Sequence, residues 1–356
     1  MTHRELARQL KISPASLSLI INNKPGISDA TRERIKSQLS NMGYADLIRN
    51  PEVVADNATA PLSKGEIGFV IYKRHGAVLN QHPFFMLLME SIENRASKYG
   101  YNVLLITIDH ADYPKEQIKA LDRKGISGAI LFATEMLSED LTNFETLQIP
   151  YIALDNFFER IPVNTVAIDN EMGTYQAISY LVSKGHRKIG YLQSDISISS
   201  FDERSSGYRD ALHAFGIIPD PNFTFRVPYS EEESYLAMHN ILSRKPLLPT
   251  AFVCDDDTIA IGAMRAFKEA GISVPNDISI IGFNDRPSCE MVKPPLTSVN
   301  VPRSSFGAEA VDALVKQMDR ISRQSLMARS LKLRVGTQLI ERSSVKDLNN
   351  SISTGS

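Results

Sequence analysis

The sequence is poor in cysteine and has no tryptophan, with 2 Cys among 356 residues. Cys254 and Cys289 show no CxxC spacing and are too few for a disulfide framework, so we interpret Cys254 as a reduced thiol. No group of His, Cys and Asp residues has the spacing of metal ligands, and His186 is interpreted as a structural residue. The sequence therefore predicts neither a disulfide scaffold nor a metal site.

Long apolar runs are also missing. No stretch of about 18 apolar residues could span a membrane, and the first dozen residues are polar and cationic, without the apolar region of a secretory signal. No glycine-rich phosphate loop follows the first predicted strand, which disfavours an enzyme with a nucleotide cofactor. We therefore expect a cytoplasmic, nucleoid-associated protein that has no cofactor and no membrane partner.

The first 44 residues have the pattern of three short helices. Residues 2–5 form a capping box, and Ser13 with Pro14 has the form of a second helix start. Ser28 is placed to cap a third helix, which Gly43 closes. Three helices with a tight turn between the first two are typical of the helix-turn-helix, so we predict an all-α DNA-binding head over residues 1–44.

The charge distribution supports this interpretation. Residues 1–50 hold eight Lys/Arg and four Asp/Glu, a net charge of +4, whereas the whole chain carries −2, so the remainder carries −6. A basic segment on an acidic body suits a module that faces phosphate groups. The alternative is a small helical bundle whose charges are only solvated.

The chain after the head alternates between strands and helices. Residues 45–64 lack regular periodicity and include Pro51 and Pro61, so we interpret them as a linker. From residue 65 onward, short apolar runs alternate with helical patterns over more than 200 residues. Predicted strands cover 67–71, 103–108, 129–132, 151–154, 165–168, 188–192, 250–254 and 278–282, and helices cover about 84–99, 114–123, 171–183, a segment from 204, and 259–270. This alternation predicts two lobes with doubly wound parallel sheets.

Polar residues follow several of the predicted strands. They are Asp155, Asp169, residues 255–257 and residues 284–285. Ligands of open parallel sheets lie beyond the carboxyl ends of the strands, although a single carboxylate there can serve only as a helix N-cap. Four such ends around one cleft favour a binder of polyhydroxylated or amine-bearing ligands.

Three blocks of the sequence, taken in order, resemble the lactose-repressor (LacI/GalR) family of bacterial transcription regulators. The first block is 12–22 with 27–32 and 43–44, the second is 166–173 with 185–189, and the third is 249–263 with 274–285 and 294–299. The resemblance implies a homodimer whose heads each read half of a pseudo-palindromic operator in double-stranded DNA. It also implies a periplasmic-binding-protein-like core that holds a small effector between its two lobes.

The resemblance assigns DNA-binding roles to the head. Pro14, Ala15 and Leu19 occupy the positions of base-edge readers, although Leu19 could instead be buried in the core of the head. These three side chains cannot form bidentate hydrogen bonds to a base, so we expect apolar contacts, phosphate positioning and DNA shape to carry specificity. The residues implied to hold phosphates or flanking bases, with the capping serines, are Thr2, His3, Arg4, Ser13, Ser16, Ser18, Asn22, Ser28 and Thr31.

The linker departs from the family pattern, in which a short helix presents a Leu wedge to the minor groove. Val53 or Val54 falls nearest that position, and a Val can still unstack a base step. Pro51 could serve only as an early helix residue. A flexible tether is the alternative for this segment.

The resemblance also implies an effector pocket. Asp155 resembles a hydroxyl acceptor, Arg204 a ligand clamp, and Asp256 and Asn284 take positions where relatives carry Asn and Asp. Such donors and acceptors can bind vicinal hydroxyls, which favours a sugar. Phe84 and Phe85 would stack on the sugar face, with core packing as their alternative, and Tyr72 and Arg74 are further candidates.

Together these features predict a transcription regulator, most simply a repressor, rather than an enzyme. The alternative is a cytoplasmic solute-binding protein without a gene-regulatory role. We expect an effector-binding and dimerisation domain over 65–343, with lobe 1 at about 65–162 and 299–328 and lobe 2 at about 163–298 and 329–343. Residues 344–356 are expected to form a flexible tail, and the absence of leucine heptads near this end favours a dimer over a tetramer.

Overall fold

The computed structural model divides the chain into two compact units, Met1–Ser63 and Lys64–Ser356. It describes residues 10, 12, 20, 28, 31–32, 34–35, 63–78, 83–322 and 330–349, without the side chains of 83–87 and 321–322. No helix within these ranges is both long enough and apolar enough to cross a membrane.

In the first unit, the described residues include part of the predicted third helix. The Ser28 carbonyl accepts a hydrogen bond from the Arg32 N–H at 2.9 Å, and the Ser28 and Thr31 hydroxyls lie 2.8 Å apart. These contacts are those of a helix that begins at Ser28, and residues 31–32 and 34–35 are helical. Ile20 and Ile35 are fully buried. Of the first two predicted helices and the turn between them, only residues 10, 12 and 20 are described.

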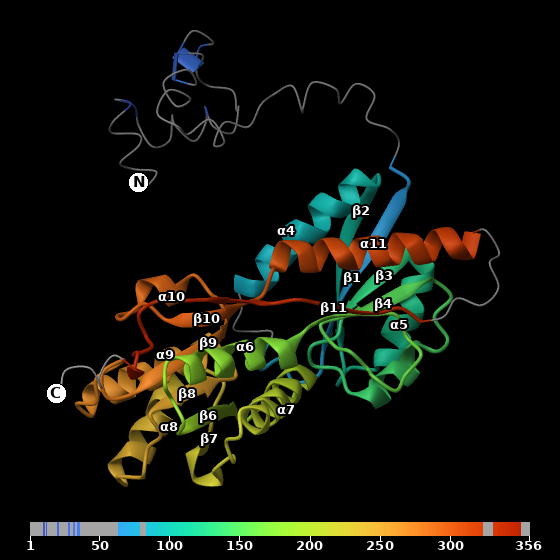
Figure 1. Cartoon of the computed structure of the whole chain (residues 1–356). Helices are drawn as coiled ribbons and strands as arrows, with labels where there is room; N and C mark the ends of the chain where they lie inside the picture. Colours follow the sequence, from blue (N-terminus) through green and yellow to red (C-terminus); the bar gives the residue numbers. More distant parts are fainter. Residues whose placement is uncertain are drawn as a thin grey trace, which may run out of the picture. The chain divides into compact units, whose positions relative to one another are not determined.

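The second unit contains two six-stranded sheets, and the first forms lobe 1 (Figure 1). Its strands, in spatial order, are β11 (Lys332–Val335), β5 (Thr165–Ile168), β4 (Tyr151–Leu154), β3 (Gly128–Phe132), β1 (Gly65–Lys73) and β2 (Tyr101–Asp109), all parallel. Its helices are α4 (Pro83–Lys98), α5 (Pro114–Arg123), α11 (Arg303–Ser322) and the 3₁₀ helix η4 (Ser138–Phe144). Side chains of β1 alternate between the two faces of the sheet, as strand geometry requires. Phe69 packs with the core beneath α4 and α11, and Val70 with the core beneath α5.

The second sheet forms lobe 2 and repeats this layering. Its order is β12 (Gln338–Ile340), β10 (Thr297–Asn300), β9 (Ser279–Asn284), β8 (Ala251–Cys254), β6 (Ile189–Ser194) and β7 (Thr224–Val227), with only β12 antiparallel to its neighbour. Its helices are α6 (Asn170–Ser183), α7 (Ser199–Ala214), α8 (Glu231–Ser243), α9 (Asp257–Glu269), α10 (Ser288–Met291) and the 3₁₀ helix η5 (Pro221–Phe223). The predicted pair of doubly wound parallel lobes is confirmed.

The chain passes between the lobes three times: after β5, after β10 and after β11. These crossings differ from the expected lobe limits at residues 162, 298 and 328. Strand β5 pairs with β4 and β11, so lobe 1 extends to Ile168 and includes β11, whereas β10 pairs with β9 and keeps lobe 2 continuous to Asn300. A short apolar run reveals a strand but does not reveal its neighbours, which is why the limits were misplaced.

The segment after β12 also differs from the expected flexible tail. Ser344 is fully buried and its hydroxyl donates to the Ile280 carbonyl at 2.6 Å. The Leu348 N–H donates to the Lys184 carbonyl at 2.8 Å. His186, interpreted as structural, lies with Nε2 3.1 Å from the Lys346 carbonyl. Residues 344–349 are therefore docked on lobe 2, because their backbone and hydroxyl groups complete hydrogen bonds at the sheet edge.

Candidate functional site

Asp256 is the centre of a polar network at the carboxyl edge of the lobe 2 sheet. It follows β8 and caps α9, where its Oδ1 accepts the Thr258 N–H at 2.7 Å. Its Oδ2 accepts from the Asn284 amide at 2.5 Å, the Arg286 guanidinium at 3.0 Å and the Tyr229 hydroxyl at 3.2 Å. Asp256 is fully buried, so these donors offset the cost of removing its charge from water. Asp256 therefore both caps α9 and accepts the hydrogen bonds that connect the network.

Arg204 projects from α7 into the same network and is also buried. Its Nε donates to the Asn170 side-chain oxygen at 2.9 Å, and its two terminal nitrogens donate to the Asp255 carbonyl at 2.5 Å and to Asn284 Oδ1 at 3.5 Å. The guanidinium carbon lies 3.7 Å from the centre of the Phe283 ring, a cation–π contact. These contacts hold Arg204 in one position, which lowers the entropy it would lose on binding a ligand.

Asp155 approaches from lobe 1, at the end of β4. Its backbone has φ 69°, a left-handed conformation that an L-residue adopts at a cost, and its Oδ2 accepts the Thr134 hydroxyl at 2.6 Å. Burial raises the pKa of Asp155 to about 6, although the Thr134 hydrogen bond and the charge of Arg204 act in the opposite direction. The positive charge of Arg204, on lobe 2, thus favours the ionised form of a carboxyl group on lobe 1.

Two further carboxylates flank Asp256. Asp255 accepts the Tyr191 hydroxyl at 2.5 Å and the Ser194 N–H at 2.6 Å, while Asp257 accepts the Ser298 hydroxyl at 2.6 Å. Burial raises the pKa of each of these two groups to about 7. The lobe 2 edge is thus held together by side chains of α6, α7, α9, β6, β9 and β10 and of the loops that follow β7, β8 and β9.

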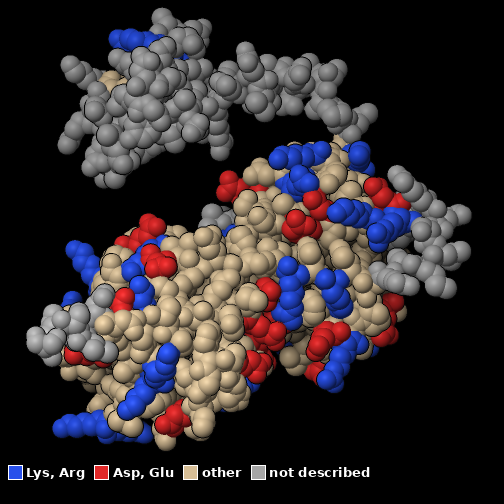
Figure 2. Space-filling view, in the orientation of Figure 1, with Lys and Arg blue, Asp and Glu red and all other residues tan. Residues whose placement is uncertain are grey.

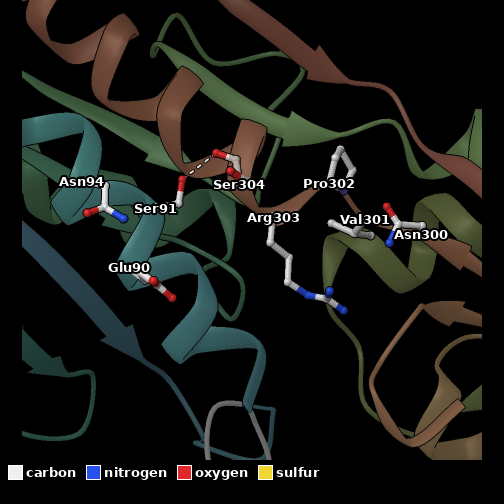
Figure 3. Close-up of a pocket in the computed structure, with 8 residues that line it drawn as sticks. All are labelled: Glu90, Ser91, Asn94, Asn300, Val301, Pro302, Arg303 and Ser304. Atoms are coloured by element: carbon white, nitrogen blue, oxygen red, sulfur yellow. Dashed lines mark hydrogen bonds between the residues drawn. The ribbon is translucent and has the colours of Figure 1, made fainter. Parts of the chain in front are cut away.

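Arg303 marks a second region, at the crossing from β10 to α11. Its guanidinium donates to the Asn284 carbonyl at 2.5 Å and to the Asp285 carbonyl at 3.0 Å. A cavity of about 430 Å³ lies between this crossing and α4, and Figure 3 shows Arg303 extending away from the Ser91–Ser304 hydrogen bond. The cavity is lined by Glu90, Ser91, Asn94, Asn300, Val301, Pro302, Arg303 and Ser304.

A second cavity, of about 400 Å³, lies between the lobes on the side of β11. Residues of η4 and of the loop after β4 line it from lobe 1, and α6 and α7 line it from lobe 2. Its lining includes Asn156, Phe157, Asp202, Glu203 and Arg334. Both cavities therefore adjoin the crossings between the lobes.

The structure brings four of the predicted effector residues to this interlobe region and places two others elsewhere. Asp155, Arg204, Asp256 and Asn284 lie at the carboxyl edges described above. Tyr72 is fully buried, and its hydroxyl donates to Asp140 Oδ1 at 2.9 Å. Arg74 Nη1 donates to both oxygens of the same carboxylate, at 2.9 and 2.7 Å. Asp140 of η4 thus engages both side chains, which corrects their assignment to the pocket.

Other predicted site residues lie outside what the structure describes. Phe84 and Phe85 belong to α4, but the structure does not describe their side chains. Of the predicted DNA-binding residues, Ser28 is exposed and Thr31 is partly exposed. The others lie outside the described residues: Thr2, His3, Arg4, Ser13, Pro14, Ala15, Ser16, Ser18, Leu19, Asn22, Val53 and Val54.

Sequence reasoning missed Tyr229, Arg286 and Arg303. Arg286 lies two residues after the predicted Asn284, so its distance from a strand end was an available signal. Tyr229 and Arg303 reach the site from elements that the sequence did not identify. Within the described ranges, no group of three or more His, Cys, Asp or Glu residues is arranged to hold a metal ion.

Comparison with known proteins relates the chain to regulators. Residues 178–345 match a family model described as a periplasmic binding protein-like domain. The chain is 29% identical to the HTH-type transcriptional repressor CytR of Escherichia coli (strain K12) over 318 residues, 89% of each protein. It is also 29% identical to the HTH-type transcriptional repressor PurR of Edwardsiella ictaluri over 349 residues, 97% of each protein. A solved LacI family transcriptional regulator from Enterococcus faecium with bound ribose has a TM-score of 0.65 and 26% identity, covering 80% of this chain and 99% of that one.

Proposed function

We propose that the chain is a member of the lactose-repressor (LacI/GalR) family of transcription regulators and that it is an effector-controlled repressor. The head binds an operator, and a small effector binds between the lobes and alters operator affinity. The observation that carries the proposal is the connected set of Arg204, Asp256 and Asn284 on lobe 2, with Asp155 opposite on lobe 1. A ligand that contacts both sides changes the free-energy difference between lobe arrangements, which is the requirement for allosteric control.

The effector that fits this set best is a sugar. Arg204 and Asn284 supply hydrogen-bond donors, whereas Asp155 and Asp256 supply acceptors, and neighbouring hydroxyl groups both donate and accept. Aromatic side chains would cover the apolar face of such a ligand, and we propose Phe84 and Phe85 for this role. The ribose bound in the Enterococcus faecium regulator supports this class of ligand.

The DNA contacts proposed for the head follow from the residue types. Pro14, Ala15 and Leu19 read base edges through apolar contact, and the surrounding hydroxyl and amide side chains hold phosphates. Val53 or Val54 enters the minor groove at the operator centre. Two heads in a homodimer would read a pseudo-palindromic site, because the symmetry of the protein is repeated in the DNA.

The first experiment is selection of duplexes from a random library by the purified full-length protein. We expect a consensus with two-fold symmetry, and enrichment of a flexible central step would indicate that the hinge valines engage the minor groove. Failure to enrich any sequence at low salt, with or without added sugars, would contradict the proposal. The alternative, a solute-binding protein without a regulatory role, would then be favoured.

The second experiment tests the clamp. A panel of sugars, ribose among them, is tested for its effect on operator affinity. In Arg204→Ala this effect should be weaker, whereas operator affinity without sugar should be unchanged. Arg209→Ala is the matched control, since Arg209 lies on the same helix but is exposed. Loss of operator binding in a folded Arg204→Ala protein would contradict the separation of the two sites, as would an unchanged sugar response.

A further inference from the structure

An ion pair joins the two lobes beside their third crossing. Arg334 lies in β11 of lobe 1, and Glu203 lies in α7 of lobe 2. The two guanidinium nitrogens of Arg334 each lie 3.2 Å from a different oxygen of Glu203, so the pair is bidentate. The two side chains are 26% and 18% exposed, which protects the pair from much of the screening that weakens surface ion pairs. Figure 2 shows acidic and basic side chains side by side where the two lobes meet.

The same carboxylate connects to the proposed effector clamp. Glu203 Oε2 accepts the side-chain amide of Asn170 at 2.8 Å, and the oxygen of that amide accepts Arg204 Nε at 2.9 Å. The hydrogen-bonded chain therefore runs from Arg334 through Glu203 and Asn170 to Arg204. Asn170 is buried and begins α6, directly after the first crossing between the lobes. A displacement of Arg204 would disturb this chain at a point where it meets lobe 1.

The lobe 1 end of the chain is itself held in place. The guanidinium carbon of Arg334 lies 3.9 Å from the centre of the Phe157 ring, in the loop after β4. Lys332 of the same strand donates to the carbonyls of Phe157 and Phe158 at 3.1 and 2.8 Å. Stacking on Phe157 and the neighbouring Lys332 thus hold the Arg334 side chain in position. Because it is already held, Arg334 loses little side-chain entropy when it forms the ion pair with Glu203.

We propose that the Glu203–Arg334 ion pair is a latch that stabilises the lobe arrangement of this structure. The latch sets the spacing of the lobes before any ligand binds. This inference does not depend on DNA binding or on the identity of the effector, so it can fail while the proposed function holds.

The experiment measures the lobe spacing directly. Spin labels are attached at Lys119→Cys on α5 and Asn240→Cys on α8, which are exposed positions in lobe 1 and lobe 2. The native Cys254 and Cys289 are buried and leave the labels specific. Pulsed dipolar spectroscopy then gives the distance distribution for the full-length protein without ligand or DNA. The labelled protein is co-assembled with an excess of unlabelled protein, so that label pairs within one protomer dominate the distribution of a homodimer.

We expect one narrow distance in the otherwise unchanged protein and a second population in Glu203→Gln and in Arg334→Gln. The ratio of the altered to the original population should rise about tenfold, which corresponds to about 1.4 kcal/mol. The charge exchange Glu203→Arg with Arg334→Glu should return most of the distribution to the original distance, because it restores the attraction with the two charges reversed.

The matched control is Arg95→Gln. Arg95 forms a bidentate pair with Asp312 at 2.7 and 2.8 Å, but both residues belong to lobe 1. Its distribution should coincide with that of the unchanged protein. The latch is refuted if Glu203→Gln and Arg334→Gln leave the distribution unchanged, or if Arg95→Gln broadens it equally. A charge exchange that restores nothing would show that the attraction between these two groups is not the cause.

Discussion

Three consecutive carboxylates, Asp255, Asp256 and Asp257, follow β8 and are all fully buried. Burial raises the pKa of Asp255 to about 7 in the folded protein, well above its ordinary value of 3.8. The folded state therefore retains a proton that the unfolded chain releases above about pH 4. The contribution of Asp255 to the free energy of unfolding consequently falls as the pH rises from about 4 to 7, and this contribution is lost above the folded pKa.

Asp255→Asn removes this titration. Relative to the unchanged protein, the free energy of unfolding of Asp255→Asn should rise by about 2 kcal/mol between pH 5.5 and pH 8. Urea denaturation at several pH values measures the difference. The exposed Asp210→Asn variant is the control, and its difference from the unchanged protein should be the same at both ends of the range. A constant difference for Asp255→Asn as well would show that the buried carboxyl does not retain its proton.

At the scale of elements, Glu135 organises the loop after β1. Its two carboxylate oxygens accept the backbone N–H groups of Arg74, His75, Gly76 and Val78 at 2.8 to 3.1 Å. Burial alone would raise the pKa of Glu135, but these hydrogen bonds and the nearby His75 lower it. The carboxylate therefore stabilises the loop above the ordinary pKa of a glutamate, and this stabilisation is lost as the pH falls through the lowered value.

Glu135→Gln should loosen that loop at pH 7, because an amide nitrogen would then face backbone donors. A buried donor left without an acceptor costs about 1–3 kcal/mol. Hydrogen exchange of residues 74–78 should accelerate about tenfold or more, and the difference from the unchanged protein should shrink as the pH falls through the lowered pKa of Glu135. Glu139→Gln is the control, since that side chain is 71% exposed and forms an ion pair with the Arg74 side chain rather than with the backbone of the loop. Equal exchange in the two variants would contradict the anchoring role of Glu135.

Helices α8 and α9 pack closely at Gly262. A Cβ at this position would lie 2.5 Å from the Glu231 carbonyl oxygen and 2.9 Å from the Tyr235 nitrogen, both backbone atoms of α8. Alanine in a helix is favoured over glycine by about 1 kcal/mol, but overpacking against a rigid backbone costs about 1–3 kcal/mol. Gly262→Ala should therefore lower the thermal unfolding midpoint. Gly336→Ala is the control, because no atom lies within 4 Å of a Cβ at this position, and it should change the midpoint little. An unchanged midpoint in both variants would show that α8 and α9 separate at little cost.

The elements that the sequence predicts correctly are those with continuous apolar runs. Residues 151–154 and 165–168 are strands with the predicted bounds, because central parallel strands are buried on both faces. β7 and β10 escaped prediction because TFRV and TSVN mix polar and apolar residues. Asp155, Asp256 and Asn284 were identifiable since they follow strands, whereas Tyr229, Arg303 and Glu203 reach the interlobe region through long side chains whose direction depends on tertiary packing.

At the scale of the whole molecule, charge is divided between the head and the body. Residues 1–50 carry +4, and the remaining residues carry −6. An acidic body is repelled by DNA, so the attraction to phosphates must come from the head. Each phosphate that a cation neutralises releases a counterion, and this release makes the affinity fall as salt rises.

We therefore expect the logarithm of operator affinity to fall steeply and linearly with the logarithm of the salt concentration. For a dimer with about 6–10 phosphate contacts, the loss between 50 and 200 mM salt is about 10³–10⁵-fold. Fluorescence anisotropy with the selected operator measures it, and Arg265→Gln, which removes an exposed charge of lobe 2, should leave the slope unchanged. A nearly flat dependence would mean that the protein neutralises few phosphates, and a slope that changes in Arg265→Gln would mean that the body makes some of the phosphate contacts. Either result would contradict the assignment of these contacts to the basic head.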